Sequence, residues 1–318
     1  MTDRQINKLL RKEFSILGWL LLAYYLLLNT LVTVQMMVDS AGQILQNLLS
    51  GRFLLELDFD ALINNGWGYF AAAVVAFVIL YAWKGADYWR DEIFHREKKM
   101  TFGVFFCAAC LCIGGQMIST IWLTALELLY NLFDASILTT LEQVSGSNTT
   151  FSMVIYGALV APISEEIVFR GFILRSLRPY GRRFAIFGSA LLFALFHGNL
   201  LQGPFAFLVG LIMGYLACEY SIKWAIALHV FNNLILAEGL TRLLEVLPYP
   251  VADVVNMLIF GGFFAVSILI LNVKKAQILE YNQGEWIDRR CVKCLLTSPG
   301  ILVFALLMTG SAVAWMLA

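Results

Sequence analysis

The sequence over residues 151–177 reads FSMVIYGALVAPISEEIVFRGFILRSL. A helix needs about 20 mainly apolar residues to cross a bilayer, and this stretch is long enough. Three charged side chains interrupt its apolar character: Glu165, Glu166 and Arg170. Ionisable side chains within a bilayer are costly unless they are paired, so each is treated as a candidate functional residue. We therefore expect a membrane helix that carries a polar site.

The composition of the whole chain agrees with a membrane protein. Of its 318 residues, 60% are hydrophobic and only 14% are charged, and the mean hydropathy is +0.77. Soluble domains are nearer half apolar and a quarter charged. One soluble core of this size cannot hide such an excess, so much of it has to face lipid. We predict an all-α, polytopic transmembrane bundle that forms a single membrane domain over residues 1–318.

Apolar runs separated by polar stretches predict about eight or nine membrane helices. Each run has close to the length that a spanning helix requires. The predicted spans lie near residues 14–38, 67–83, 101–125, 151–177, 184–200, 204–222, 224–244, 251–273 and 295–317.

The distribution of charge predicts how the chain crosses the membrane. Lys and Arg total 22 and Asp and Glu total 22, so the balance gives no reason to expect nucleic-acid binding. In the loops at 39–66 and 134–150, Arg52 is the only basic residue. The loops expected on the N-terminal side are rich in base: Lys84, Arg90, Arg96, Lys98, Lys99, Arg175, Arg178, Arg182, Arg183, Lys274, Lys275, Arg289, Arg290 and Lys293. Because basic loops stay in the cytoplasm, we expect a multi-pass protein of the cell membrane, a bacterial plasma membrane, with a cytoplasmic N-terminus.

The charged side chains of the 151–177 stretch are spaced for two different tasks. Glu166 and Arg170 are four residues apart and share one helix face, as an ion pair requires. Glu165 lies about 100° around the helix from Glu166 and can point into a cavity. An alternative is an ion cluster at a helix end, with Arg170 extending to the water interface. Pro162 interrupts the backbone hydrogen bonding just before the pair.

Two of the three histidines lie in other apolar stretches. His197 follows Phe193 by one helical turn, and Asn233 follows His229 by one turn on the same face. A single buried histidine is more often structural, but two on different helices, beside a buried carboxylate pair, favour a site. The rise of a helix places all of these residues at depths compatible with one cavity between the fourth, fifth and seventh helices.

Three motifs in this order resemble those of a known family. They are Glu-Glu-x-x-x-Arg at 165–170, Phe-x-x-x-His at 193–197 and His-x-x-x-Asn at 229–233. Together they resemble the CAAX protease and bacteriocin-processing (CPBP, Abi-type) family of intramembrane proteases, which includes the Ras-converting CAAX endopeptidase. The resemblance covers about residues 151–240, which would form the catalytic core. It implies that Glu165 and His197 activate water.

The resemblance assigns the other four residues as well. His229 and Asn233 would stabilise the oxyanion, and Glu166 with Arg170 would hold the site together. Peptide hydrolysis does require a base for water and donors for the oxyanion. We therefore expect an intramembrane endopeptidase that cleaves a membrane-associated or lipid-modified peptide or protein precursor. Its partners would be membrane lipid and that substrate; the oligomeric state is not indicated.

Two alternatives stay open at this stage. The family is often called a metalloprotease, and Glu165, His197 and His229 could form a zinc site with an open water position. Asn233 is a poor zinc ligand but a good oxyanion donor, which favours a metal-free reaction. The other alternative is a membrane transporter, or a non-catalytic immunity or scaffold protein that binds a partner through the same buried polar residues. Transporters commonly show inverted repeats, which this sequence lacks.

Overall fold

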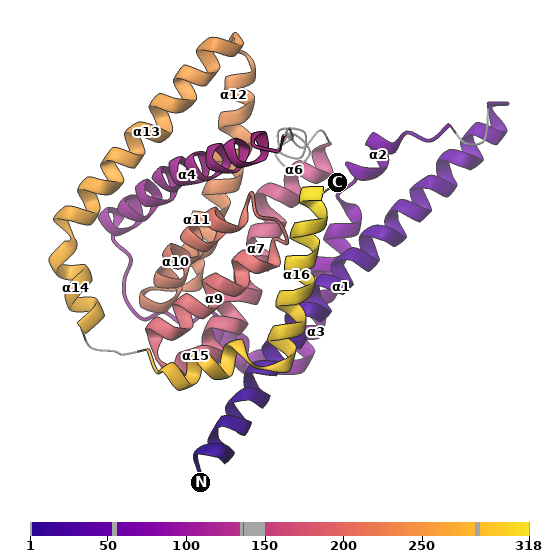
Figure 1. The fold of residues 1–318 in the computed structure, drawn as a ribbon. Coiled ribbons are helices and arrows are strands. Elements are labelled where there is room, and N and C mark those ends of the chain that lie inside the picture. Colours follow the sequence, from indigo (N-terminus) through magenta and orange to yellow (C-terminus); the bar gives the residue numbers. More distant parts are fainter. Residues whose placement is uncertain (1, 53–55, 134–135, 137–149, 284–286, 318) are drawn as a thin grey trace.

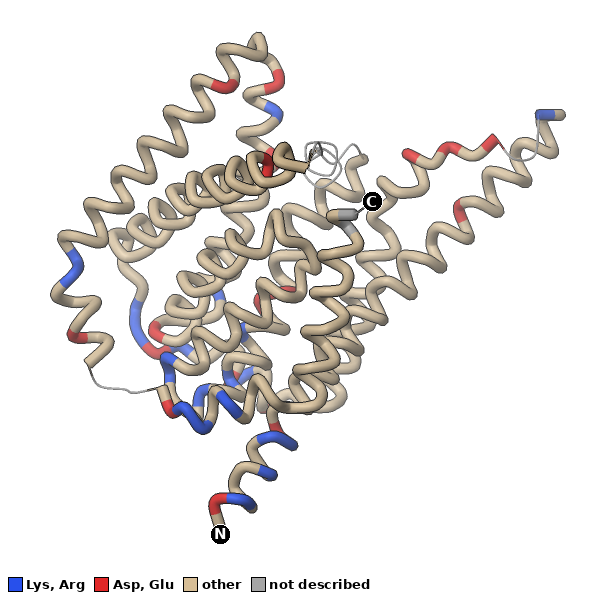
Figure 2. Tube along the Cα trace, in the orientation of Figure 1, with Lys and Arg blue, Asp and Glu red and all other residues tan. Residues whose placement is uncertain are grey.

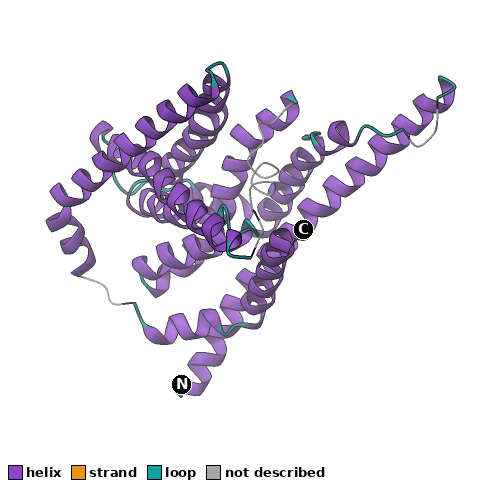
Figure 3. Cartoon of the chain, turned by 45° about the horizontal axis from the view of Figure 1, so that its top comes forward, coloured by secondary structure: helices purple, strands orange, loops and turns teal. Residues whose placement is uncertain are grey.

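A computed structural model describes residues 2–52, 56–133, 136, 150–283 and 287–317 of the chain. Of the residues that the structure describes, 87% are helical and none lies in a strand. Figure 3 shows helices joined by short loops throughout. The prediction of an all-α protein is confirmed.

The helices follow one another along the chain with few long connections (Figure 1). In order they are α1 (Asp3–Leu49), α2 (Phe59–Ile63), α3 (Trp67–Tyr88), η1 (Trp89–Ile93), α4 (Phe102–Asn131), α6 (Phe151–Ile155), η2 (Tyr156–Val160), α7 (Ala161–Glu166), η3 (Ile167–Leu174), α8 (Arg175–Leu177), η4 (Arg178–Tyr180), α9 (Arg182–Phe196), α10 (Gly203–Glu219), α11 (Ile222–Val230), η5 (Phe231–Leu240), α12 (Thr241–Glu245), α13 (Tyr249–Val273), α14 (Lys275–Gln283), α15 (Arg289–Leu296) and α16 (Pro299–Leu317).

Five of the described helices are long and apolar enough to cross a membrane. A sixth span results if α15 and α16, which meet at a bend of 62°, are counted as one. The five helices cover Asp3–Leu49, Phe59–Ile93, Phe102–Asn131, Phe151–Tyr180 and Tyr249–Val273. A multi-pass membrane protein follows. α9 has only 15 residues, or about 22 Å of helix, so the predicted count of eight or nine spans is not confirmed by length and composition alone.

The first helix differs from its predicted extent. We expected the first span to end near residue 38, where polar residues begin, but α1 continues to Leu49. Polar residues do not break a helix when their backbone can keep its helical hydrogen bonds. The helix ends only before Gly51, whose φ of 68° is readily adopted by glycine.

The helices that carry the predicted site residues lie in the middle of the bundle. In Figure 1, α7, α9 and α11 lie between α4 and α13 on one side and α1, α3 and α16 on the other. α9 and α10 approach closely because Gly210 faces Ala190, where an added Cβ would lie 3.1 Å from the alanine. Small residues permit such close helix contacts in membranes. The close approach also brings the backbone of α10 to the site.

Charged residues are divided between the two ends of the bundle. Figure 2 shows Lys and Arg gathered at the end that carries the N-terminus, with acidic residues more prominent at the opposite end. This distribution agrees with the asymmetry seen in the sequence. The orientation in a membrane stays a prediction.

Candidate functional site

The two adjacent glutamates lie in a short α-helical segment between two π-helical segments. α7 contains Glu165 and Glu166, η2 precedes it and η3 follows it. A third π-helical segment, η5, begins two residues after His229 and contains Asn233. π-helical turns are rare and frequently occur at functional sites. The three segments bring the candidate residues together from two parts of the chain.

Pro162 explains how the side chain of Asn233 is held. In η2 the backbone N–H of Ala161 donates to the carbonyl of Tyr156, five residues earlier. The next bond in this register would join residue 162 to the carbonyl of Gly157, but proline has no N–H. Asn233 Nδ2 takes that place and donates to Gly157 O at 2.9 Å. One amide hydrogen of Asn233 is used in this way, and the other remains available.

Glu166 is the centre of a buried polar network. Its Oε1 accepts from Arg170 Nη1 at 2.8 Å and from His229 Nδ1 at 2.9 Å. Arg170 also donates from Nη2 to Gly210 O at 3.2 Å, and its guanidinium lies 4.5 Å from the ring centroid of Phe193. The Glu166–Arg170 pair that the spacing predicts is therefore present. Both side chains are 0% exposed, so Arg170 does not extend to water as the alternative required.

Glu165 differs from its neighbour in how deeply it is buried. Its side chain is 18% exposed, whereas that of Glu166 is 0% exposed. Glu165 Oε2 lies 3.7 Å from His229 Nε2, the ring nitrogen that faces away from Glu166. This distance is too long for a direct hydrogen bond. Glu165 is thus the less buried carboxylate of the pair.

His197 contacts Phe193, whose ring also contacts His229. It follows α9 directly, and its Nδ1 donates to the carbonyl of Phe193 at 2.9 Å. Because a carbonyl only accepts, Nδ1 carries the proton, and Nε2 of the neutral ring is free to accept. Phe193 packs edge-on against both histidine rings, at centroid distances of 4.8 Å to His197 and 5.8 Å to His229. No hydrogen bond or ion pair joins His197 to Glu165 in the part of the chain that the structure describes.

Several residues near the site were not predicted from the sequence. Asn232 Nδ2 donates to Asn233 Oδ1 at 3.0 Å, and Cys112 Sγ donates to Asn232 Oδ1 at 3.5 Å. Tyr24 of α1 and Tyr156 of η2 both interact electrostatically with Glu165. Two consecutive asparagines in an apolar helix were a signal that could have identified Asn232. The tyrosines carried no such signal, because tyrosine is common in apolar helices.

The zinc alternative requires three of these residues to share one ion. No group of three or more His, Cys, Asp or Glu side chains that could hold a metal ion occurs among the described residues. A zinc ligand set places each nitrogen or oxygen donor about 2.0–2.2 Å from the metal. His197 and His229 each use Nδ1 in a hydrogen bond, to Phe193 O and to Glu166, which is also how histidines that bind zinc through Nε2 are held. A metalloprotease is not supported by the described residues, and whether a metal takes part stays a prediction.

The fold and the site define an all-helical, multi-pass membrane protein with a buried carboxylate and histidine cluster. Residues 147–235 match the family model described as "Type II CAAX prenyl endopeptidase Rce1-like". Over this segment the chain is similar to the CAAX protease family, and the segment contains all six residues singled out in the sequence. No curated protein and no solved structure matches the chain.

Proposed function

We propose that this protein is an intramembrane endopeptidase that cleaves a membrane-associated or lipid-modified peptide or protein precursor. The observation that carries the proposal is the position of Glu165. It is a partly exposed carboxylate, 3.7 Å from a histidine whose other nitrogen bonds to the buried Glu166–Arg170 pair. A reactive carboxylate beside a rigidly oriented imidazole is suited to general base chemistry.

In the proposed reaction, Glu165 takes a proton from a water molecule held beside it. The water oxygen bonds to the carbonyl carbon of the scissile peptide, whose C=O electron pair moves to the oxygen. The tetrahedral intermediate then collapses, the C–N bond breaks, and Glu165 returns the proton to the leaving amine. His197 would hold the same water through Nε2, which its bond to Phe193 leaves free.

His229 and Asn233 would stabilise the negative oxygen of the intermediate. That oxygen and the attacking oxygen share one carbon, so the base and the oxyanion donors must lie a few ångströms apart, as Glu165 and His229 do. His229 donates a hydrogen bond from Nδ1–H to Glu166 and would donate another from Nε2 in its doubly protonated form. Asn233 would donate its second amide hydrogen. The reaction so written has no metal step.

The membrane setting supports a lipid-associated substrate. The matched family is described as prenyl endopeptidases, and a lipid-modified peptide partitions into the bilayer around the bundle. We further propose eight or nine spans in a cell membrane, a cytoplasmic N-terminus, and a site cavity between the fourth, fifth and seventh predicted helices. The concentration of Lys and Arg at the N-terminal end supports that orientation.

Peptide cleavage by the purified protein in detergent tests the proposal. A library of fluorogenic peptides is offered with and without an S-farnesyl group on cysteine. The wild type is compared with Glu165→Ala, His197→Ala and the matched surface variant Glu280→Gln, which lies on exposed α14. We expect cleavage by the wild type and Glu280→Gln only. Equal turnover by all four proteins, or solute uptake by proteoliposomes without any cleavage, contradicts the proposal.

A further inference from the structure

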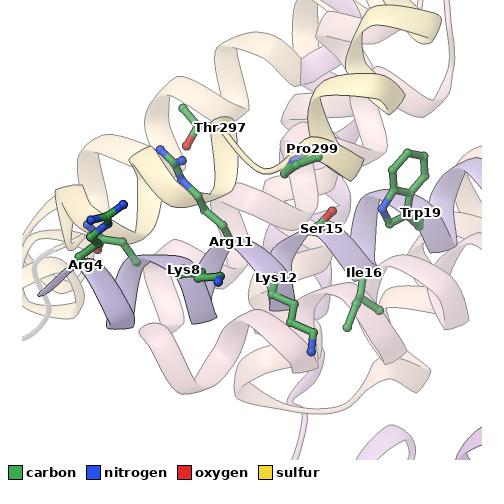
Figure 4. Close-up of a pocket in the computed structure, with 10 residues that line it drawn as sticks. Arg4, Lys8, Arg11, Lys12, Ser15, Ile16, Trp19, Thr297 and Pro299 are labelled. Carbon is green, nitrogen blue, oxygen red and sulfur yellow. The ribbon is translucent and has the colours of Figure 1, made fainter. Parts of the chain in front are cut away.

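A second polar feature lies far from the candidate active site, at the N-terminal end of the bundle. A cavity of about 970 Å³ opens between the first turns of α1 and the corner where α15 meets α16 (Figure 4). Along α1 it is lined by four cations, which we call the basic groove: Arg4, Lys8, Arg11 and Lys12. Their spacing places all four toward one side of the helix.

The groove lies beside the point at which α16 is fixed to α1. Gly300 N–H donates to Ser15 Oγ at 2.8 Å, and a Cβ at Gly18 would lie 2.1 Å from the backbone of Gly300. The two helices therefore touch through their backbones at this point. α15 meets α16 at a bend of 62° and also contacts α1, where Arg290 pairs with Asp3 at 2.9 Å. Thr297 and Pro299 form the wall opposite the cations.

The charges of the groove are not compensated by the protein. No acidic side chain is among the described residues that line it. The two carboxylates of the first helix turns have other partners, since Asp3 pairs with Arg290 at 2.9 Å and Glu13 bonds to Tyr180. None of the four cations forms an ion pair with any residue that the structure describes. A polyanionic or phosphate-bearing ligand would therefore meet an uncompensated positive surface.

The other end of the groove is apolar. Ile16 is 46% exposed and Trp19 is 47% exposed, and both line the cavity where α1 enters its long apolar stretch. At 1.5 Å per residue, Arg4 and Trp19 are about 22 Å apart along the helix. Tryptophan is favoured at the boundary between headgroups and acyl chains. A fitting ligand is thus anionic at one end and apolar at the other, which a free phosphate or an acidic peptide is not.

We propose that the basic groove binds the headgroup of an anionic phospholipid, with the acyl chains directed along Trp19 and Ile16. The site is independent of the protease reaction. Neutralising a basic residue near a membrane surface weakens attraction to anionic lipid by about 1 kcal/mol, so removing two should weaken binding by at least about tenfold. The loss of affinity for anionic lipid should occur when two charges of the basic groove are removed. It should not occur when two basic residues elsewhere are removed, although the change in net charge is the same.

The full chain in detergent is titrated with dioleoyl phosphatidylglycerol, and bound lipid is counted by native mass spectrometry. The test variant is Lys8→Gln/Arg11→Gln, and the control Lys274→Gln/Lys275→Gln loses the same two charges at exposed positions. We expect tight binding by the wild type and control, at least about tenfold weaker binding by the test variant, and little binding of dioleoyl phosphatidylcholine. Equal binding by both variants, equal binding of both lipids, or equally tight binding of glycerol 3-phosphate overturns the proposal.

A second measurement does not use the Lys8→Gln/Arg11→Gln variant and so tests the proposal even if that variant folds poorly. Phosphatidylglycerol brominated on its acyl chains quenches nearby tryptophan fluorescence. We expect the quenched fraction to fall in Trp19→Phe relative to the wild type. An unchanged fraction overturns the proposed placement of the acyl chains.

Discussion

Glu165 and His229 face each other across 3.7 Å, with the other nitrogen of the same ring bonded to Glu166 at 2.9 Å. One imidazole therefore lies between two adjacent carboxylates of very different exposure. The buried one fixes the ring, as the carboxylate of a hydrolase triad does. The exposed one is left free to act on water. Each of these roles can be tested by substitution.

The buried role predicts a large loss of stability in Glu166→Gln. The substitution keeps the shape of the side chain but leaves Arg170, which is fully buried, without its counter-charge. Removing one partner of a buried ion pair costs about 3–5 kcal/mol. Denaturant unfolding in detergent should show a fall of this size, while Glu280→Gln at the surface should unfold like the wild type. An unfolding free energy for Glu166→Gln within about 1 kcal/mol of the wild type would contradict this role.

Pro162→Ala should release Asn233. Alanine at position 162 has a backbone N–H, which proline lacks. In the π-helical pattern this N–H would donate to the carbonyl of Gly157, five residues earlier, and would compete with the amide of Asn233 for it. We expect kcat to fall by about tenfold, less than the roughly 100-fold or greater loss that follows removal of an oxyanion donor, with helix content unchanged by circular dichroism. Pro248→Ala, before α13, is the control. A Pro162→Ala variant with the kcat of the wild type would show that the proline does not position Asn233.

Asn232 is predicted to be a positioning residue. Its Nδ2 donates to Asn233 Oδ1. This bond fixes the orientation of the Asn233 amide and therefore the direction in which its Nδ2 hydrogens point. Asn232→Leu should lower kcat by about tenfold and leave KM nearly unchanged, since the contact supports only the transition state. Cys112→Ser keeps a donor for Asn232 Oδ1 and should retain activity. A rise in KM without a fall in kcat would assign Asn232 to substrate binding instead.

A surface ion pair predicts a weak pH dependence of stability. Arg178 lies 2.7 Å from Glu97, and this hydrogen bond lowers the pKa of the Glu97 carboxyl below its ordinary value of 4.5. Because the folded pKa is the lower one, the stabilisation is present above pH 4.5 and is lost as the pH falls through the folded pKa. Partial exposure limits it to less than about 1 kcal/mol. Unfolding measured at pH 7 and pH 4 should show this contribution in the wild type and not in Glu97→Gln; equal pH dependence in both would refute it.

The sequence predicted an all-helical membrane protein because its apolar runs are long and bounded by polar residues. It also predicted the Glu166–Arg170 pair, which depends only on a spacing of four residues. It did not predict that His229 would bond to Glu166, since that contact joins helices 63 residues apart. The backbone carbonyls of Gly157 and Gly210 also accept hydrogen bonds in the site. Every residue has a backbone carbonyl, so the residue type at these positions could not predict that contribution. π-helical segments likewise have no strong residue preference that would reveal them.

The expected partnership of Glu165 with His197 came from the resemblance alone. In the structure Phe193 contacts both histidine rings, and no hydrogen bond or ion pair joins Glu165 to His197 among the described residues. Their joint action on one water stays a prediction. It depends on where a substrate peptide places that water, which neither the spacing of the motifs nor the free protein defines.

The division of work between the two adjacent glutamates is tested most directly by the kcat of Glu165→Gln. The variant should unfold like the wild type, because Glu165 makes no ion pair with Arg170 and is partly exposed. On a peptide that the wild type cleaves, kcat should fall by about 100-fold to 10,000-fold, the contribution of a general base. A stable Glu165→Gln protein with a kcat within about threefold of the wild type would contradict Glu165 as the base.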